Sequence, residues 1–352
     1  MALLQKQFKK FEENIRLNDI EDNEPLLDKR NMLIKELQEW GKKNDKPSFD
    51  WFNQGSYHMS TGIKPQEDED HDIDVAIVYN VNIKDEGYKD PTKLKKWVRD
   101  GLNIEKREVT IMNSCVRVQY RHKGEVQYHV DFAIYGKEFN DNNEEVKKHL
   151  AKGKEFAYEE KKFWEEAQPK ELRKLIKEEL FKEDEELGGT KRAQFRRIVK
   201  YLKRWKDRNF TSGGDARPTG IAMTAICYEW FQPYVTKDWE GNIEEKDMLA
   251  FKDLVSRCID NNYGLDVKLP VMPKNELFQK LKKSDYNIQA YKDKLLSLCD
   301  ALVKAYNETD PHEAAKAVKK AFNNDEDFPV PDKEYTAKVT IAPAITTSSA
   351  SA

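Results

Sequence analysis

The feature that most constrains this chain is a strand candidate at residues 72–79 that carries two acidic side chains. It reads Asp72-Ile73-Asp74-Val75-Ala76-Ile77-Val78-Tyr79. The alternation predicts a β-strand with Asp72 and Asp74 on one side and aliphatic residues on the other. Two adjacent carboxylates repel each other and are costly to bury unless a cation neutralises them. Carboxylate oxygens are the ligands that Mg²⁺ takes together with substrate phosphates, so the pattern predicts a magnesium site.

A third carboxylate lies in a second strand candidate, residues 126–134, where Asp131 stands among apolar residues. Strands are depleted in Asp, so a single acid inside one needs a reason. A neighbouring strand that carries Asp72 and Asp74 supplies that reason, because the three carboxylates would then share a metal site.

A phosphate-binding turn is predicted just upstream, at Gly55-Ser56. Glycine lets the backbone approach a ligand closely, and the pair offers backbone N–H groups and a hydroxyl. We expect residues 48–54 to form the first strand and residues 57–61 to begin a short helix. The N-terminus of that helix would face the phosphates.

These residues together resemble the polymerase-β-like nucleotidyltransferase superfamily. Within it, the segment Gln54-Gly55-Ser56-Tyr57 and the later Asp72-Ile73-Asp74-Val75 are similar to the cGAS/DncV-like (CD-NTase) enzymes of bacterial anti-phage systems. The resemblance implies an α+β fold, with a nucleotidyltransferase core of mixed twisted sheet and helices plus a C-terminal helical lobe. We expect N-terminal helices and the core in residues 1–170, the lobe that closes the nucleotide pocket in 171–331 and a flexible tail in 332–352.

The resemblance also implies the chemistry, which is two-metal transfer of a nucleotidyl group with release of pyrophosphate. Asp72 and Asp74 would hold the Mg²⁺ that escorts the triphosphate, and both would join Asp131 in holding a second Mg²⁺. Mn²⁺ would substitute for either ion, and Gly55 and Ser56 would position the phosphates. The substrates would be NTPs, ATP and GTP foremost. The product would be a cyclic di- or trinucleotide second messenger that acts on a downstream effector.

A basic amphipathic helix is predicted over residues 191–208, whose core-facing residues are Phe195, Ile198, Val199, Leu202 and Trp205. Two interpretations of its basic residues stay open. They form a solvated face, or Lys203 and Lys200 neutralise the triphosphate of a bound nucleotide. In the family, a Lys that stands two residues before a Trp on this helix neutralises the triphosphate, and Lys203 stands two residues before Trp205.

Three functions remain open on the sequence: a cyclic oligonucleotide synthase, a nucleotidyltransferase with a linear product or another target, and a catalytically silent nucleotide-binding module. The intact set of three acids argues against the silent module. The chain has 61 basic and 64 acidic residues, which argues against a dedicated nucleic-acid surface.

No stretch of the sequence has the length and apolar character of a membrane span, and the N-terminus lacks the apolar core of a signal peptide. We therefore expect a cytoplasmic protein without a membrane partner. The C-terminal residues are small and polar, which predicts a flexible tail. In some relatives the C-terminus is joined to targets by ubiquitin-like machinery, and the terminal Ala352 is compatible with such conjugation.

The remaining periodicity predicts mainly helices, with one hairpin. Two strands, at residues 108–120 and 126–135, are expected to pair through a turn at 121–124. Helices are expected at residues 3–20, 26–42, 91–102, 144–166, 221–231, 247–259, 275–283, 286–307 and 311–322.

Overall fold

The structure is a computed structural model that describes residues 4–17, 24–66, 71–104, 107–122 and 125–333. It divides into two compact units. The sheet unit comprises Arg16–Arg192 and Lys268–Glu276, and the helical unit comprises Met1–Ile15, Ala193–Val267 and Leu277–Ala352. Of the expected tail at 332–352, all but residues 332 and 333 lie outside the described part, as does Ala352.

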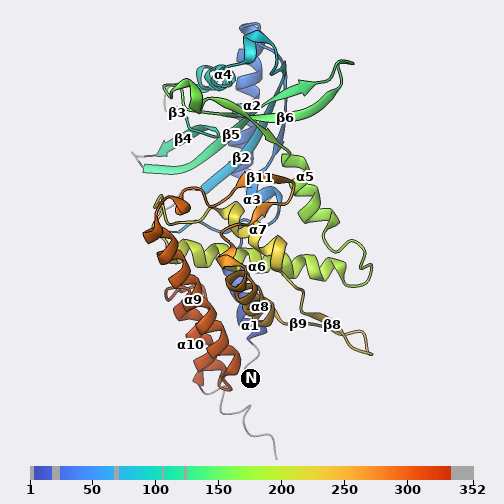
Figure 1. The fold of residues 1–352 in the computed structure, drawn as a ribbon, viewed down its shortest axis with the longest axis vertical. Helices are drawn as coiled ribbons and strands as arrows, with labels where there is room; N and C mark the ends of the chain where they lie inside the picture. Colours follow the sequence, from blue (N-terminus) through green and yellow to red (C-terminus); the bar gives the residue numbers. More distant parts are fainter. Residues whose placement is uncertain (1–3, 18–23, 67–70, 105–106, 123–124, 334–352) are drawn as a thin grey trace, which may run out of the picture. The chain divides into compact units, whose positions relative to one another are not determined.

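Within the described residues of the sheet unit, seven strands form one mixed sheet (Figure 1). The order is β1-β2-β5-β4-β3, and β6 pairs with both β5 and β7. The pair β2–β5 is parallel, whereas the other pairs are antiparallel. The strands are β1 (Phe49–Asn53), β2 (His71–Asn82), β3 (Arg107–Ile111), β4 (Val116–His122), β5 (Glu125–Phe139), β6 (Glu145–Lys152) and β7 (Phe163–Ala167).

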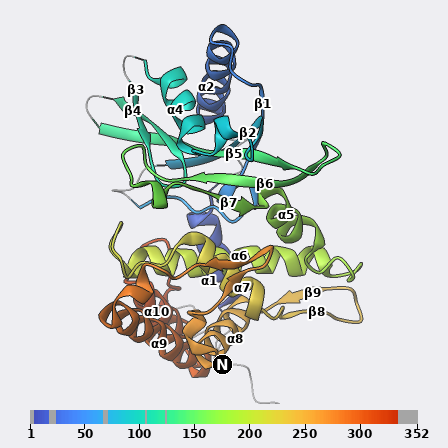
Figure 2. The same cartoon turned by 45° about the horizontal axis from the view of Figure 1, so that its top comes forward.

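One face of this sheet is covered by α2 (Glu24–Lys43) and α4 (Thr92–Leu102), which lie side by side in Figures 1 and 2. Apolar residues of both helices pack in one core with alternate residues of β2 and β5, including Ile73, Val75 and Phe132. Burial of this apolar surface is the main stabilising contribution here. The other face carries Ala76, Val78, Ala133 and Tyr135. By the period of 2, Asp74 and Asp131 lie on this second face.

Shorter elements complete the sheet unit. The turn after β1 is the helix α3 (Gly55–His58), and α5 (Pro169–Lys174) continues into a π-helical turn at Leu175–Glu179. A small two-stranded sheet joins β10 (Lys268–Leu269) and β11 (Met272–Glu276).

Three expectations from the sequence are wrong. Residues 144–166 form β6 and β7 rather than a helix. Ion pairs such as Lys147–Glu166 at 2.8 Å join these two strands, so cross-strand charge pairing replaces the apolar alternation by which strands are usually recognised. The strand expected at 108–120 is two strands, β3 and β4, separated by the turn at 112–115. The helix expected at 275–283 is the end of β11 and a 3₁₀ turn at Leu281–Lys283.

The helical unit is built around an aromatic core. Phe11 lies 4.9 Å from Phe322 and 5.1 Å from Phe328 between ring centroids, and Tyr201 packs edge-on to Phe8 at 5.2 Å. Such edge-to-face pairs add stability beyond the area that they bury. The helices of this unit are α1 (Gln5–Ile15), α6 (Gly188–Asn209), α7 (Gly220–Trp230), α8 (Asp247–Asp260), α9 (Asp285–Asn307) and α10 (Pro311–Ala321). The first residues of α6, up to Arg192, belong to the sheet unit.

A hairpin of β8 (Val235–Lys237) and β9 (Ile243–Glu245) extends from the helices of this unit and leads into α8 (Figure 2). Within the described residues, no helix is both long enough and apolar enough to span a membrane.

Candidate active site

Two of the predicted carboxylates lie on neighbouring strands of the sheet unit. Asp74 on β2 and Asp131 on β5 are direct partners in the parallel register. Asp72 pairs with His129 two positions earlier, and its side chain lies outside the described part of the structure. The sequence placed these acids on two adjacent strands, and the register aligns Asp74 with Asp131.

The predicted Gly-Ser turn lies directly against Asp74. The N–H of Gln54 donates to the carbonyl oxygen of Asp74 at 3.0 Å, which fixes the end of β1 beside β2. Gly55 follows with a φ of +75°, and a Cβ at this position would lie 2.0 Å from Oδ2 of Asp74. Only glycine fits both the left-handed conformation and the close approach. Ser56 is half-buried in α3, which is a single turn that starts at Gly55 rather than at residue 57.

Buried hydrogen bonds hold the turn from both ends. The hydroxyl of Tyr135 on β5 donates to Oε1 of Gln54 at 3.0 Å, and burial raises the pKa of Tyr135 above its ordinary value. The N–H of Thr61, which is fully buried, donates to the carbonyl oxygen of Ser56 at 2.9 Å. The sequence analysis did not identify Tyr135 or its contact with Gln54, because Gln54 follows β1 and Tyr135 lies on β5, far away along the chain.

Negative charge is concentrated around the two carboxylates. The pKa of the Cys115 thiol, next to the start of β4, is raised to about 12 by burial and then by Asp131 and Asp74, with Arg117 acting in the opposite sense. Arg117 on β4 is the register partner of Asp131 on the side away from β2. It donates from Nε to Oδ1 of Asp131 at 2.8 Å and from Nη2 to Oδ2 at 2.7 Å.

Positive charge lies next to the Gly-Ser turn. The pKa of His58, the last residue of α3, is lowered to about 4 by burial and by the charges of Arg173 and Lys177. Arg173 also pairs with Glu178 at 3.0 Å. A turn that offers backbone N–H groups and has positive charge near its last residue suits a phosphate group. The sequence analysis missed Arg173 and Lys177, because they lie in a charged stretch that has no motif.

The candidate phosphate-binding lysines lie on α6 in the helical unit. The five residues predicted to face the core are all buried, with at most 2% of their surface exposed. Lys200 and Lys203 are buried as well. The two lysines therefore do not belong to a solvated face of α6. Lys200 forms an ion pair with Glu12 of α1. Lys203 lies beside the start of α7, where a Cβ on Gly220 would be 3.7 Å from its Cε.

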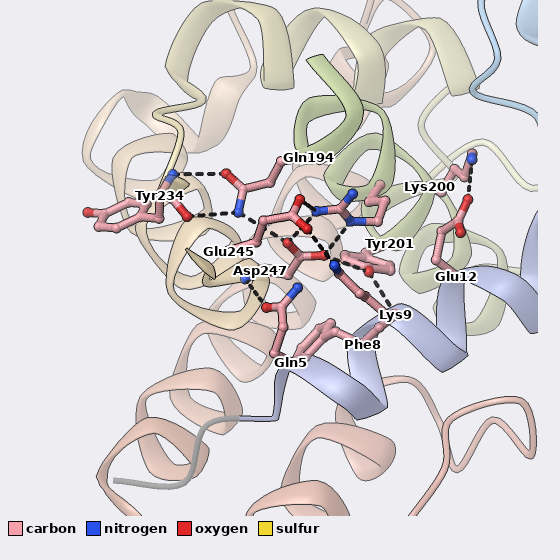
Figure 3. A network of polar contacts seen from close by, with 11 residues as sticks. Gln5, Phe8, Lys9, Glu12, Gln194, Lys200, Tyr201, Tyr234, Glu245 and Asp247 are labelled. Carbon is pink, nitrogen blue, oxygen red and sulfur yellow. Dashed lines mark hydrogen bonds and ion pairs between the residues drawn. The ribbon is translucent and has the colours of Figure 1, made fainter. Parts of the chain in front are cut away.

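A buried polar network fixes the same helix (Figure 3). Asp247, fully buried at the start of α8, accepts hydrogen bonds from Nε of Arg197 at 2.6 Å and from the hydroxyl of Tyr201 at 3.0 Å. The side chain of Gln5 on α1 accepts the N–H of Asp247 at 2.7 Å, and Nε2 of Gln194 donates to Oδ1 of Asp247 at 3.1 Å. The network joins α6 to α1 and α8, so it determines where the basic residues of α6 point.

The donors of the sheet unit fit a hard divalent cation. Asp74 and Asp131 offer carboxylate oxygens side by side, and glycine at position 55 leaves room for the carboxylate of Asp74. Among the residues that the structure describes, no cluster of three or more His, Cys, Asp or Glu side chains forms a metal site, and Asp72 is not among the side chains described.

Comparisons with known proteins concern the family and the fold of this chain. Residues 49–135 match the family described as "Cyclic GMP-AMP synthase DncV-like, nucleotidyltransferase domain". The crystal structure of Vibrio cholerae DncV cyclic AMP-GMP synthase, a prokaryotic cGAS homolog, superposes with a TM-score of 0.64 and 16% identity, over 94% of this chain and 98% of that chain.

Two ligand complexes match less extensively. The 3'-deoxy GTP bound form of Escherichia coli DncV has a TM-score of 0.56 and 20% identity, over 78% of this chain and 69% of that chain. The Vibrio cholerae DncV complex with the linear intermediate 5' pppA(3',5')pG has a TM-score of 0.55 and 18% identity, over 79% and 69%. The expected resemblance and the expected α+β fold class are confirmed.

Proposed function

We propose that this chain, in which residues 49–135 form a DncV-like nucleotidyltransferase domain, joins NTPs into a cyclic di- or trinucleotide. The observation that carries the proposal is the register of Asp74 with Asp131, with the Gly55 turn against Asp74. Carboxylates placed beside a phosphate-binding turn are what nucleotidyl transfer needs from a protein, because its contribution is mostly position and charge.

Each residue has a role in this reaction. Asp72, Asp74 and Asp131 would hold two Mg²⁺ ions, which when bound neutralise the triphosphate and lower the pKa of the attacking ribose hydroxyl. The backbone of Gly55 and the hydroxyl of Ser56 bind the β- and γ-phosphates. Lys203 offsets the charge of those phosphates. The ribose oxygen forms a bond to the α-phosphorus while the bond to the β-phosphate oxygen breaks, and pyrophosphate leaves.

Lys200 takes a structural part in this proposal. Its ammonium group already pairs with Glu12 in a buried site, and breaking a buried ion pair is costly. We therefore assign Lys203, and not Lys200, to the phosphates. Arg173 and Lys177 add positive charge on the side of the Gly-Ser turn.

The cyclic product rests on the comparison rather than on the carboxylates, which specify nucleotidyl transfer and no more. Relatives with this fold include a cyclic AMP-GMP synthase and its complex with a linear intermediate. By analogy, the product would be a second messenger that activates an effector in anti-phage (CBASS) defence, and Ala352 would be the point of conjugation by ubiquitin-like machinery. A mass shift on the C-terminal peptide of the chain purified from its host would test the conjugation.

The activity is tested with the purified full chain, the four NTPs singly and mixed, and Mg²⁺ or Mn²⁺. Products are digested with phosphatase and analysed by mass spectrometry. A phosphatase-resistant product from the wild type, absent from Asp74→Asn and Asp131→Asn, supports cyclic synthesis. Asp50→Asn is the matched control, because Asp50 lies on the neighbouring strand β1 with an exposed side chain.

Three other outcomes decide against the proposal in different ways. A phosphatase-sensitive oligomer would establish nucleotidyl transfer and exclude cyclisation under those conditions. A product made equally by the wild type and both Asp variants would show that the carboxylates are not the catalytic groups. No product with any NTP and either metal would favour the silent nucleotide-binding module.

A further inference from the structure

Three charged residues form a row across three adjacent strands of the sheet. Asp74 on β2 is the register partner of Asp131 on β5, and Asp131 is the register partner of Arg117 on β4. Both oxygens of Asp131 accept hydrogen bonds from Arg117, at 2.8 and 2.7 Å. The guanidinium group therefore binds the carboxylate at two points, in the planar geometry that lysine cannot reproduce.

This pair compensates an unfavourable charge arrangement. Two carboxylates on directly neighbouring residues of adjacent strands repel each other when no cation is present. Asp131 is largely removed from water, with 12% of its side chain exposed, so its charge needs a partner. Arg117 supplies one positive charge at the end of the row.

Hydrogen bonds hold the turn before β4 in place, whereas the side chain of Arg117 on β4 has access to solvent. The ammonium group of Lys95, itself fully buried, donates to the carbonyl oxygens of Met112, Asn113 and Gly153 at 3.1, 2.8 and 2.9 Å. These bonds fix the turn that precedes β4. The side chain of Arg117 is 28% exposed, so part of it is in contact with water.

We propose that Arg117 competes with the divalent cation for the carboxylate of Asp131. The inference rests on the proposed function, since it concerns the same carboxylates. Mg²⁺ demands near-ideal octahedral geometry, and Asp131 has both oxygens committed to Arg117. A guanidinium beside a bound Mg²⁺ also repels it. Arg117 thus stabilises the two carboxylates when no cation is bound and raises the metal concentration at which a cation binds them.

The test measures Mn²⁺ binding to the purified full chain by electron paramagnetic resonance, with no nucleotide present. Arg117→Met removes the charge and both hydrogen bonds, and we expect it to bind Mn²⁺ roughly tenfold more tightly than the wild type. Arg117→Lys keeps the charge and loses the two-point geometry, so its affinity should lie between the two. In an Asp131→Asn background, the effect of Arg117→Met should shrink.

The matched control is Arg107→Met. Arg107, on β3 of the same sheet, makes a two-point pair with Glu36, including Nη2 to Oε1 at 2.9 Å, and neither residue is in the carboxylate row. Its removal should leave Mn²⁺ affinity unchanged. A melting curve in EDTA adds a second readout, because Arg117→Met should melt lower than the wild type without metal and gain more from added Mn²⁺.

Unchanged or weaker Mn²⁺ binding by Arg117→Met overturns the inference, because Arg117 would then orient Asp131 for the metal instead of competing with it. If Arg117→Met does not fold, Arg117→Lys decides by the same criterion. A wild type that binds Mn²⁺ but makes no nucleotide product refutes the proposed function alone. If the wild type makes product and the Arg117 variants bind Mn²⁺ with the affinity of the wild type, the inference alone is refuted. Mn²⁺ binding absent from every variant overturns the inference, and the product assay then decides on the proposed function, because there the metal can also arrive with the triphosphate.

Discussion

Replacing Gly55 with alanine tests whether the contact between the Gly-Ser turn and Asp74 determines the site. A Cβ at position 55 would lie 2.0 Å from Oδ2 and 2.7 Å from Cγ of Asp74, and φ is +75°. The left-handed conformation costs a residue with a Cβ about 1–3 kcal/mol. Inserting a methyl group against a packed side chain costs about 1–3 kcal/mol more. We expect Gly55→Ala to lose roughly 2–4 kcal/mol of unfolding free energy after partial relaxation.

The second consequence concerns activity. Because Asp74 must move for the methyl group to fit, the carboxylate leaves its place beside Asp131, and product formation should fall by about 10²-fold or more. A misplacement of the order of 1 Å is sufficient for such a loss. Circular dichroism at the assay temperature establishes that the variant is folded.

The measurement is thermal unfolding without nucleotide, followed by the product assay below the melting temperature. For a unit of this size, each kcal/mol shifts Tm by about 2–4 °C, so Gly55→Ala should melt roughly 5–15 °C lower. Gly41→Ala is the matched control, because Gly41 lies in α2 of the same unit and a Cβ there meets nothing within 4 Å. It should be stabilised by about 0.5–1 kcal/mol. Wild-type Tm and activity in Gly55→Ala would refute the reasoning.

Three further predictions concern charges. Arg197→Met leaves the buried carboxylate of Asp247 without its main cation and should cost about 3–5 kcal/mol in urea unfolding. Burial is the largest effect on Asp247 and raises its pKa, but its hydrogen bonds and the charge of Arg197 together outweigh burial and lower the pKa. The cost should therefore shrink as pH falls below about 4, and a constant cost would contradict this. Arg173→Ala should raise the pKa of His58 from about 4 toward 6.5 in an NMR titration. The pKa of His58 is lower in the folded than in the unfolded protein, so the unfolded protein binds the proton first and the free energy of unfolding decreases as pH falls from about 6.5 to 4. This decrease should be smaller in Arg173→Ala than in the wild type. Lys203→Met should lower kcat/KM for NTPs by about 10–100-fold in protein that circular dichroism shows to be folded, and an unchanged kcat/KM would remove the lysine from the phosphate site.

The sequence alone located the strands that carry Asp74 and Asp131, because apolar alternation is a local property. The period of 2 around Asp74 and Asp131 distinguished the core face of each strand from its polar face. The helix predicted at residues 191–208, which is part of α6, followed from the spacing of its apolar residues. The Gly-Ser turn was also predictable, since glycine at a close backbone approach leaves a local signal.

Strands that lack an apolar face were not predictable in this way. The strand β6 carries Lys residues and β7 carries Glu residues, and the two strands are joined by ion pairs such as Lys152–Glu165 at 3.1 Å. Their local sequence resembles that of a charged helix. Only the ladder offered by β5 selects the extended conformation, so the strand assignment depends on tertiary pairing.

Contacts between carboxylates and their partners depended entirely on strand order and register. Arg117 and Asp131 are 14 residues apart and meet because β4 and β5 pair antiparallel in one register. A slip of one residue would place either side chain on the opposite face of the sheet. The sequence thus determined which residues this protein has available for chemistry. The tertiary structure decided which of them neutralise one another, because charge interactions depend on distance in space and not on separation along the chain.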